Sequence, residues 1–181
     1  MQRFVKEILI SQEQLEQRVK ELGAQVSSDY AGKELLLLCV LKGGVMFLTD
    51  LAKHISIPTE IDFMAVSSYG SSTKSSGIVK IIKDLEESIE GKHVLIVEDI
   101  IDTGLTLKYL AENLLNRNPA SLKIITLIDK PANRTVDLQV DYNGFIIPDK
   151  FIVGYGLDYR QFYRNVPYIF IPNPDEDPGN R

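Results

Sequence analysis

Cysteine is almost absent from this 181-residue chain, in which Cys39 is the only one. A single cysteine excludes an intrachain disulfide and favours a reducing compartment. Cys39 lies inside the apolar run from Leu35 to Leu41. We therefore expect it to be a small buried core residue and not a reactive thiol.

Long apolar runs are lacking as well. The residues after Met1 mix charged and apolar types without the continuous apolar region of a signal peptide, and no run approaches the length of a membrane span. With 44% hydrophobic and 25% charged residues, the chain can bury one sizeable core. We expect a single soluble, cytoplasmic domain over residues 1–181.

Positive charge is also scarce, because 20 Lys and Arg residues face 25 Asp and Glu residues, for a net charge of -5. This balance argues against a broad surface for nucleic acid or an anionic membrane, since such binding draws on an excess of cations. Any bound anion should therefore meet a local pocket. The two histidines, His54 and His93, match no metal-ligand spacing, so we expect neither to be catalytic.

The pattern of apolar residues predicts alternating strands and helices. A first helix is expected after Ser11, which has the spacing of a capping box with Gln14. Strands are expected around residues 35–41, 61–65, 79–81, 94–97, 122–128, 151–153 and 168–171, and further helices around residues 47–51 and 107–115. This alternation predicts an α/β fold with a mostly parallel, doubly wound sheet.

Two polar segments interrupt this pattern. Residues 67–77 are rich in Ser and Gly, and they form either an ordinary hairpin loop or a flexible lid, because long loops within compact domains are often functional. Residues 172–181 contain three prolines and four charged residues. We expect them to form a solvated tail.

Three loops, residues 42–44, 98–106 and 129–131, follow expected strands. Ligands collect at the carboxyl ends of parallel strands. The segment from Asp102 to Thr106 begins a helix and offers backbone N–H groups, hydroxyls and a glycine, which together can bind a monophosphate. The chain has neither a Walker A loop nor a Gly-x-Gly-x-x-Gly fingerprint, which argues against nucleoside triphosphate and dinucleotide sites.

Three acids, Glu98, Asp99 and Asp102, lie beside this phosphate-binding segment. Carboxylates accept hydrogen bonds from ribose hydroxyls and bind Mg2+. Because adjacent side chains of a strand point to opposite faces, Glu98 and Asp99 can share one ligand only if the backbone bends there. The alternative is that these acids cap the strand end and the following helix.

Residues 94–104 resemble the phosphoribosyl diphosphate signature of the type I phosphoribosyltransferases. That signature is four hydrophobic residues, two acids, two hydrophobic residues and Asp-Thr-Gly, and the chain matches it throughout. The resemblance implies a mostly parallel sheet flanked by helices, with a small hood built from the N-terminal segment and roughly residues 148–172. Purine, pyrimidine and orotate enzymes and some regulators share the signature, so it does not identify the base.

Two further segments are similar to the parts of the hypoxanthine-guanine branch of this family that bind diphosphate and base. Residues 41–44 resemble its diphosphate-binding loop, in which a cis peptide precedes the lysine, here Lys42. Residues 129–131 place Lys130 where the branch recognises the 6-oxygen of the purine. A cation that donates to a carbonyl selects oxo over amino bases, so the resemblance implies that adenine is rejected.

The strongest evidence for this branch is the similarity of residues 148–158 to its base pocket. The resemblance implies that Phe151 stacks on the purine, that the Ile152 backbone recognises its edge and that Asp158 lies near the base and Mg2+. It also matches Arg164 to an arginine that binds the diphosphate, and Ser68-Tyr69 to a dipeptide of the family's mobile lid. The N-terminal helix and the C-terminal strand would contribute to the hood.

The resemblance also implies a role for each candidate residue. Asp102 would be the general base for the purine N7 proton. The substrate-binding set is Lys42, Gly43, Ser68, Tyr69, Glu98, Asp99, Thr103, Gly104, Leu105, Thr106, Lys130, Phe151, Ile152, Asp158 and Arg164, and the Mg2+ ligands would be Glu98, Asp99 and Asp158.

The implied activity is transfer of the phosphoribosyl group from phosphoribosyl diphosphate to a 6-oxopurine by a homodimer or homotetramer, with no nucleic-acid or membrane partner. One alternative is a nucleotide-sensing regulator with this fold, which the acidic balance and the lack of a helix-turn-helix pattern disfavour. Others are a xanthine-preferring relative and a pyrimidine enzyme. The segments around Lys130 and Phe151 argue against the pyrimidine enzyme.

Overall fold

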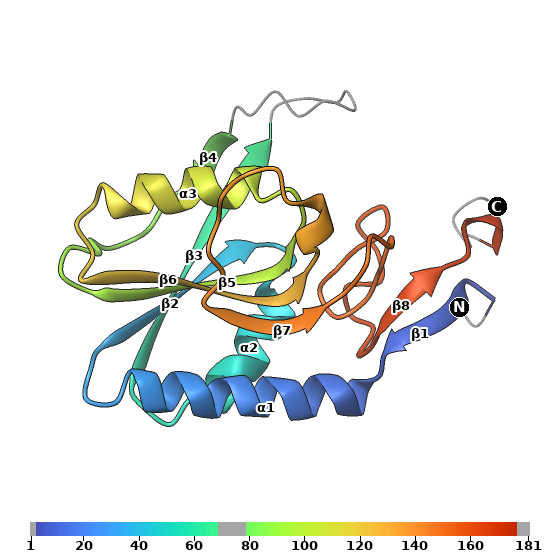
Figure 1. Ribbon diagram of the computed structural model, residues 1–181, viewed down its shortest axis with the longest axis horizontal. Coiled ribbons are helices and arrows are strands. Elements are labelled where there is room, and N and C mark those ends of the chain that lie inside the picture. The colour runs from blue at the N-terminus through green and yellow to red at the C-terminus, as the bar shows by residue number, and fades with distance from the viewer. Residues whose placement is uncertain (1–2, 69–78, 177–181) are drawn as a thin grey trace.

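The computed structural model describes residues 3–68 and 79–176 (Figure 1). The strands are β1 (Val5–Ile10), β2 (Leu35–Leu41), β3 (Thr59–Ser68), β4 (Val79–Lys83), β5 (His93–Ile101), β6 (Ser121–Asp129), β7 (Tyr142–Ile146) and β8 (Ile169–Pro172). The helices are α1 (Gln12–Asp29), α2 (Val45–Lys53) and α3 (Leu105–Leu115), with short 3-10 helices η1 (Pro131–Asn133) and η2 (Pro174–Glu176).

Six strands form the main sheet in the order β4-β3-β2-β5-β6-β7. Strands β3, β2, β5, β6 and β7 run parallel to one another, and the edge strand β4 runs antiparallel to β3. The predicted mostly parallel sheet is therefore confirmed. Among the described residues no helix is long and apolar enough to cross a membrane.

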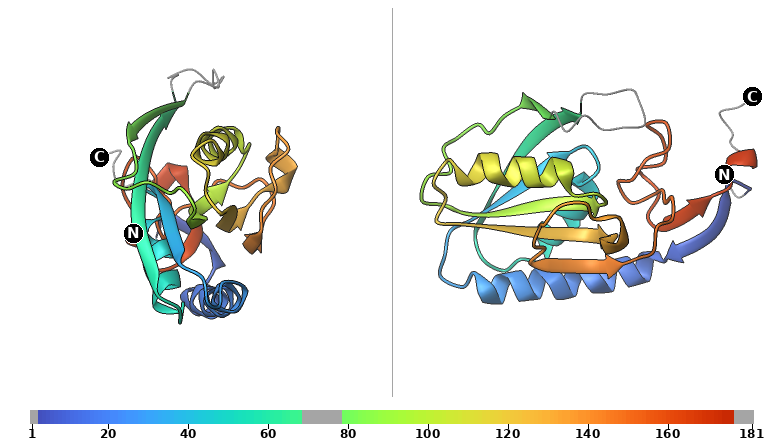
Figure 2. Two further views of the ribbon diagram at one scale, coloured as in Figure 1. Left: turned by 90° about the vertical axis from the view of Figure 1, so that its left-hand side faces the viewer. Right: turned by 45° about the horizontal axis from the view of Figure 1, so that its top comes forward.

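Helices cover both faces of this sheet (Figure 2). Helices α1 and α2 bury their apolar side chains on one face, in a cluster that includes Leu37 and Val97. Helix α3 buries Leu110 and Leu114 on the other face, against Leu38. Strand β2 therefore contributes to both cores, which explains why its sequence is a continuous apolar run.

The first helix begins where the sequence predicts. The Ser11 backbone N–H donates to Gln14 Oε1 over 2.8 Å, and the Gln14 backbone N–H donates to Ser11 Oγ over 3.3 Å, so both halves of the capping box form. At its other end α1 is joined to the main sheet, because Tyr142 of β7 donates its hydroxyl hydrogen to Asp29 over 2.8 Å.

Strands β1 and β8 form a separate antiparallel pair that projects from one end of the molecule (Figure 1). Together with residues 147–168 they form the part that we call the hood. Its apolar cluster contains Phe4, Val153, Val166 and Phe170. The expectation that the first helix belongs to the hood is wrong, because α1 packs on the main sheet.

Other local predictions are also corrected. The stretch from Phe151 to Val153 is not a strand, although Val153 forms an isolated bridge with Phe170. The expected tail begins later than predicted, because Pro172 is buried as the last residue of β8. Residues 177–181 lie outside the described part of the chain.

Two strands, β1 and β7, were not predicted. Half of the residues of β1 are exposed and only Ile10 is buried, so its sequence lacks a buried pattern. Strand β7 contains Gly144, which normally weakens a strand. A Cβ there would overlap the Leu127 carbonyl, so glycine is required for the close approach of β7 to β6.

Adjacent leucines at the end of α3 provide a test of the core. Leu114 is completely buried, whereas the side chain of Leu115 is 54% exposed. We predict that Leu114→Ala lowers the free energy of unfolding by about 2–4 kcal/mol, because it leaves a cavity under the helix. The matched change Leu115→Ala should cost less than about 1 kcal/mol. Chemical denaturation of both variants measures this difference, and equal losses would contradict the burial of α3.

Candidate active site

The loops after β2, β5 and β6 meet at the carboxyl end of the main sheet, facing the hood (Figure 1). The Lys130 backbone N–H, just after β6, donates to the carbonyl of Ile101 at the end of β5 over 3.0 Å. A Cβ at Gly156 of the hood would overlap the Gly43 carbonyl after β2. These contacts bring three distant stretches of the sequence to one place.

The phosphate loop, residues 102–106, is shorter than the loop expected from the sequence. Strand β5 continues through Ile101, so residues 98–101 are strand and not loop. Helix α3 begins at Leu105, after Gly104 in the left-handed region at φ 81°. Thr103 Oγ accepts the Leu105 N–H at 3.5 Å. The start of α3 thus directs backbone N–H groups and hydroxyls toward one space.

A cavity of about 280 Å³ lies beside this loop. Its polar lining comes from Glu98 and from the phosphate loop. Its lining residues are Val40, Leu41, Val66, Glu98, Ile100, Ile101, Asp102, Thr103, Gly104, Thr106 and Leu107. Thr103, Gly104 and Thr106, which were predicted to bind phosphate, therefore line the same cavity as Glu98. Leu105 lies between them at the first position of α3.

Glu98 extends from β5 into this cavity. Its Oε2 atom is hidden from solvent and has no hydrogen-bond partner among the described residues. Burial raises the pKa of the Glu98 carboxyl well above its ordinary value, and the charge of Asp99 raises it further. A buried oxygen without a partner is suited to accept a hydrogen bond from a ligand hydroxyl.

Asp99 lies against the loop after β2. Its carboxylate occupies the space where a Cβ of Gly43 would project, and Asp99 Oδ1 accepts the Ile100 N–H at 2.9 Å. Burial raises the pKa of Asp99 to about 6, although the Ile100 N–H and the charge of Arg164 favour its ionised form. Ionisation of the buried Asp99 therefore opposes folding, and the nearby charge of Arg164 offsets part of this cost.

The regular alternation of β5 is interrupted at these acids. Val97 and Ile100 pack on the same face of the sheet, although strict alternation over three positions would place them on opposite faces. The interruption does not bring the acids into one cavity. Glu98 lines the cavity beside the phosphate loop, whereas Asp99 contacts Gly43.

The diphosphate loop, residues 41–44, has the geometry that the resemblance implies, because the Leu41–Lys42 peptide bond is cis. Below it, Cys39 is completely buried, and a Cβ at Gly44 would come within 2.9 Å of the Cys39 Sγ. Burial, together with the negative charges of Glu98 and Asp99, raises the pKa of the thiol to about 12. Cys39 is therefore a core residue, as predicted.

Cationic groups approach the diphosphate loop from the hood. Arg164 donates to Asp158 Oδ1 over 2.7 Å and to the Gly156 carbonyl over 2.7 Å. Gln161 was not predicted, yet its Oε1 accepts from Lys42 at 3.5 Å and from Arg164 at 3.4 Å. Its position in the loop between Asp158 and Arg164 is the signal that the sequence offered.

The residues predicted to bind the base lie beside η1. Lys130 is only 6% exposed, and its Nζ donates to the Lys150 carbonyl over 2.6 Å and lies 3.4 Å from Asp149 Oδ1. The Phe151 side chain is 60% exposed, which leaves its ring available for stacking, while Ile152 is buried.

Asn133 and Arg134, which follow Lys130 in the chain, hold Asp102 in place and were not predicted. Asn133 donates to Asp102 Oδ1 over 2.7 Å. Arg134 donates to the Asp102 carbonyl over 3.2 Å and forms an ion pair with Asp129. They lie in a loop at the carboxyl end of β6, and that position was the available clue.

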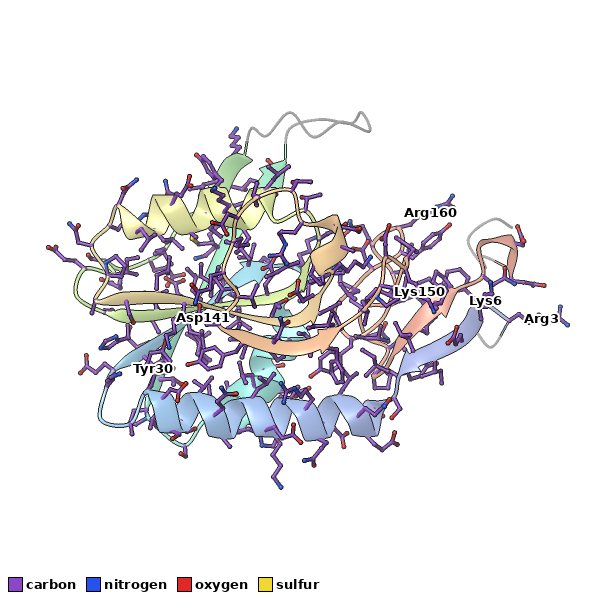
Figure 3. The ribbon with its side chains drawn as sticks, viewed as in Figure 1. Arg3, Lys6, Tyr30, Asp141, Lys150 and Arg160 are labelled. Atoms are coloured by element: carbon purple, nitrogen blue, oxygen red, sulfur yellow. The ribbon has the colours of Figure 1, made fainter. Side chains whose placement is uncertain are left out.

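Some predicted residues lie apart from this site or cannot be described. Tyr69, the Ser68 side chain and most of the predicted lid, residues 67–77, lie outside the described part of the chain. His93 contacts Tyr30 edge to face, and Tyr30 lies at the end of the molecule opposite Lys150 (Figure 3). In residues 3–68 and 79–176 no three His, Cys, Asp or Glu side chains gather to form a metal site.

A parallel sheet whose carboxyl end carries a phosphate loop, a cis-peptide loop and a buried lysine defines an α/β enzyme of the phosphoribosyl-binding class. The chain belongs to the phosphoribosyl transferase domain family, which matches residues 6–160. Its relatives place it in the hypoxanthine-guanine phosphoribosyltransferase branch of that family.

Three comparisons support this placement. The chain is 53% identical to a hypoxanthine-guanine phosphoribosyltransferase of Bacillus subtilis, over 96% of this chain and 97% of that protein. It is 51% identical to an enzyme of the same name from Mycobacterium tuberculosis, over 94% and 87% of the two chains. A crystal structure of a Staphylococcus aureus hypoxanthine phosphoribosyltransferase superposes with a TM-score of 0.94 at 52% identity, covering 97% and 95% of the two chains.

The buried charge of Asp99 predicts a pH-dependent cost in stability. Its pKa is raised from 3.8 to about 6 in the folded chain, so the folded state holds the proton more tightly than the unfolded state. The free energy of unfolding therefore falls as Asp99 ionises between about pH 4 and pH 6, and the loss is complete above that range. We predict that Asp99→Asn raises the free energy of unfolding by about 1–3 kcal/mol at pH 8 and changes it little at pH 4.

Urea titrations in buffer with EDTA at both pH values measure this effect. Asp137→Asn, a change at an exposed acid, is the control and should change stability by less than about 0.5 kcal/mol at either pH. An Asp99→Asn variant that is less stable than the native chain at pH 8 would contradict the predicted cost.

Proposed function

We propose that the protein transfers the 5-phosphoribosyl group of phosphoribosyl diphosphate to hypoxanthine, and also to guanine, and releases diphosphate in purine salvage. The observation that carries this proposal is the meeting of three loops. They bring the phosphate loop with its cavity, the cluster of Lys42, Gln161 and Arg164, and the buried Lys130 to the carboxyl end of one sheet. The relatives with this activity in their names match nearly the whole chain.

In the reaction, a purine nitrogen forms a bond to the anomeric carbon of ribose while the bond from that carbon to the diphosphate oxygen breaks. The leaving diphosphate takes the electron pair, and the purine loses a proton. No enzyme nucleophile is required. The protein must therefore bind developing negative charge, orient the sugar and remove one proton in a site with little water.

The leaving group would bind to Lys42, the backbone N–H groups of the diphosphate loop and Arg164. Support comes from the cluster in which Gln161 accepts hydrogen bonds from both Lys42 and Arg164. In this arrangement a neutral amide oxygen occupies a place between two cations where a diphosphate oxygen can bind. The planar guanidinium of Arg164 can bind two oxygens at once.

The ribose 5-phosphate would bind to the phosphate loop, and the unpaired Glu98 Oε2 would accept a hydrogen bond from a ribose hydroxyl. Asp99 would instead lie near the diphosphate, because it contacts Gly43 of the diphosphate loop and the charge of Arg164 favours its ionised form. The two acids thus serve different parts of the sugar diphosphate and do not share one hydroxyl.

The purine would stack on the exposed ring of Phe151, with its 6-oxygen at Lys130 and its edge at the Ile152 backbone. Lys130 Nζ has two acceptors, Asp149 and the Lys150 carbonyl, and an ammonium group carries three hydrogens. The third hydrogen has no acceptor among the described residues and can be donated to a carbonyl oxygen. An amino group at purine position 6 offers no acceptor there, which is the physical reason to expect discrimination against adenine.

Mg2+ is proposed as the cofactor, and the carboxylates fit an ion that is held mainly by substrate. Such ions keep one or two protein carboxylates and bind phosphate oxygens of the substrate. Asp158 and Asp99 would face the diphosphate, because both lie near Arg164. Arg164 forms an ion pair with Asp158, and its charge favours the ionised form of Asp99. When bound, Mg2+ supplies positive charge to the diphosphate oxygens.

We also propose that the protein forms a homo-oligomer in a reducing, cytoplasmic compartment. Ile146 on the edge strand β7 is 68% exposed, and Ile8 on β1 is 53% exposed, so both strands offer apolar surface for a second copy. The single buried Cys39 is consistent with a reducing compartment. Light scattering of the purified chain measures the oligomer.

The proposed function is tested by offering phosphoribosyl diphosphate and Mg2+ with hypoxanthine, guanine, xanthine, adenine or uracil and measuring nucleotide and diphosphate. Hypoxanthine and guanine should react, and adenine and uracil should not. EDTA should abolish the reaction, and added Mg2+ should restore it. Preference for xanthine would favour the xanthine-specific alternative, and no transfer to any base would reject the proposal.

Replacing Asp102 tests its role as the proton acceptor. We predict that Asp102→Asn lowers kcat about 100-fold, because an amide cannot accept the purine proton. The affinity for IMP should change only a few-fold, since the backbone of the phosphate loop is kept. The control is Asp137→Asn, which removes an exposed charge. An unchanged kcat would exclude Asp102 as the base.

Replacing Lys130 tests how the 6-oxygen is recognised. We predict that Lys130→Ala lowers kcat/KM for hypoxanthine about 10- to 100-fold and narrows its preference over adenine, because a hydrogen bond from a charged group is lost. Lys150→Ala is the matched control, since Lys150 accepts from Lys130 through its backbone carbonyl, which this change keeps. A preference that survives in Lys130→Ala would assign position 6 to another group.

A further inference from the structure

Asn133 connects the two halves of the proposed site. It is the last residue of η1, and its backbone N–H donates to the Lys130 carbonyl over 3.1 Å. Its side-chain amide donates to Asp102 Oδ1 over 2.7 Å. The same side chain also lies close enough to the Asp149 carboxylate to lower the pKa of that group.

The chemistry of these partners fixes the orientation of the amide. Asp102 and Asp149 are both carboxylates, which accept hydrogen bonds when ionised, so the amide NH2 group and not the amide oxygen must face them. That group has two hydrogens, one for each acid. The hydrogen bond from Asn133 is the main reason that the pKa of Asp149 lies below its ordinary value, and Lys130 adds to the effect.

A continuous chain of contacts thus runs between the residue proposed to recognise the purine and the residue proposed to accept its proton. Lys130 Nζ lies 3.4 Å from Asp149 Oδ1. The Asn133 amide lies close enough to Asp149 to lower its pKa, and it donates to Asp102 Oδ1. Since Lys130 is buried and also held by the Lys150 carbonyl, this end of the chain is fixed.

The backbone of Asp102 is held by a different residue. Arg134 donates through Nε to the Asp102 carbonyl over 3.2 Å and is itself paired with Asp129. The position of the main chain therefore does not depend on Asn133. What depends on Asn133 is the direction of the Asp102 carboxylate, one oxygen of which is occupied while the other remains for the substrate.

We propose that Asn133 is a positioning residue for phosphoribosyl transfer, which aims the Asp102 carboxylate at the purine and couples its direction to the residues that bind the 6-oxygen. This inference rests on the proposed function. Asn133 does not itself contact the reacting atoms. Its effect should therefore appear in the rate of the chemical step and not in the binding of phosphoribosyl diphosphate, because a small error in the direction of a reacting group is costly.

The test compares Asn133→Ala with the isosteric change Asn133→Asp by steady-state kinetics with hypoxanthine. For Asn133→Ala we expect kcat to fall about tenfold while KM for phosphoribosyl diphosphate stays within about twofold. Asn133→Asp keeps the shape of the side chain but removes its donated hydrogens and adds a like charge, so kcat should fall at least as far. A residue needed only for packing would tolerate this isosteric change.

The control is Asn113→Asp on α3, which adds the same charge at a side chain whose amide oxygen accepts from Arg117. It should leave kcat and KM within about twofold of the native values. Thermal unfolding of each variant separates positioning from folding. The proposal is overturned if Asn133→Asp has native kcat, if the loss appears in KM alone, or if every parameter falls together with the unfolding temperature. Transfer by the native chain reports separately on the proposed function.

Discussion

The carboxylate of Asp99 occupies the space in which a side chain at Gly43 would lie, and the arrangement of the hood depends on this contact. With no side chain, the backbone of the diphosphate loop can approach β5. Gly156, at φ 97°, then packs its Cα against the Gly43 carbonyl. Gly156 in turn exchanges hydrogen bonds with Arg164, as donor to the Arg164 carbonyl and as acceptor from its guanidinium. A continuous series of contacts therefore connects an acid on the central strand to a cation of the hood.

This arrangement works against stability. Glu98 and Asp99 are held where burial favours their neutral forms, and an apolar pair at the same positions would extend the core of β5. Buried charges that oppose folding are characteristic of functional sites, because a ligand supplies the hydrogen bonds and the positive charge that the protein alone does not. The unpaired Glu98 Oε2 has the same explanation.

Much of the fold could be predicted from the sequence, namely those elements for which the local sequence pattern agrees with the tertiary structure. The capping box at Ser11 and the apolar run of β2 gave elements close to those observed. The run from Phe151 to Val153 resembled a strand, but it is followed by residues 154–156, all at positive φ, which turn the chain back on itself. The edge strand β7 was missed because Gly144 serves a contact with β6 that no local pattern reveals. In the site, the sequence offered candidates with a family-specific signature, whereas Asn133, Arg134 and Gln161 act through partners that only the fold brings near.

The short loop after β6 joins the residue proposed to recognise the base to a residue that holds the phosphate loop. Asp129 pairs with Arg134, which holds the phosphate loop at the Asp102 carbonyl and covers Gly104. Lys130, next in the chain, is the residue proposed to bind the 6-oxygen of the base, and its Nζ donates to the Lys150 carbonyl. Because Asp129 and Lys130 are adjacent, a displacement of the purine end of this loop must also move the group that clamps the phosphate end. One covalently continuous segment thus sets the distance between the two ends, and we expect it to fix the spacing between the proposed purine and sugar-phosphate sites.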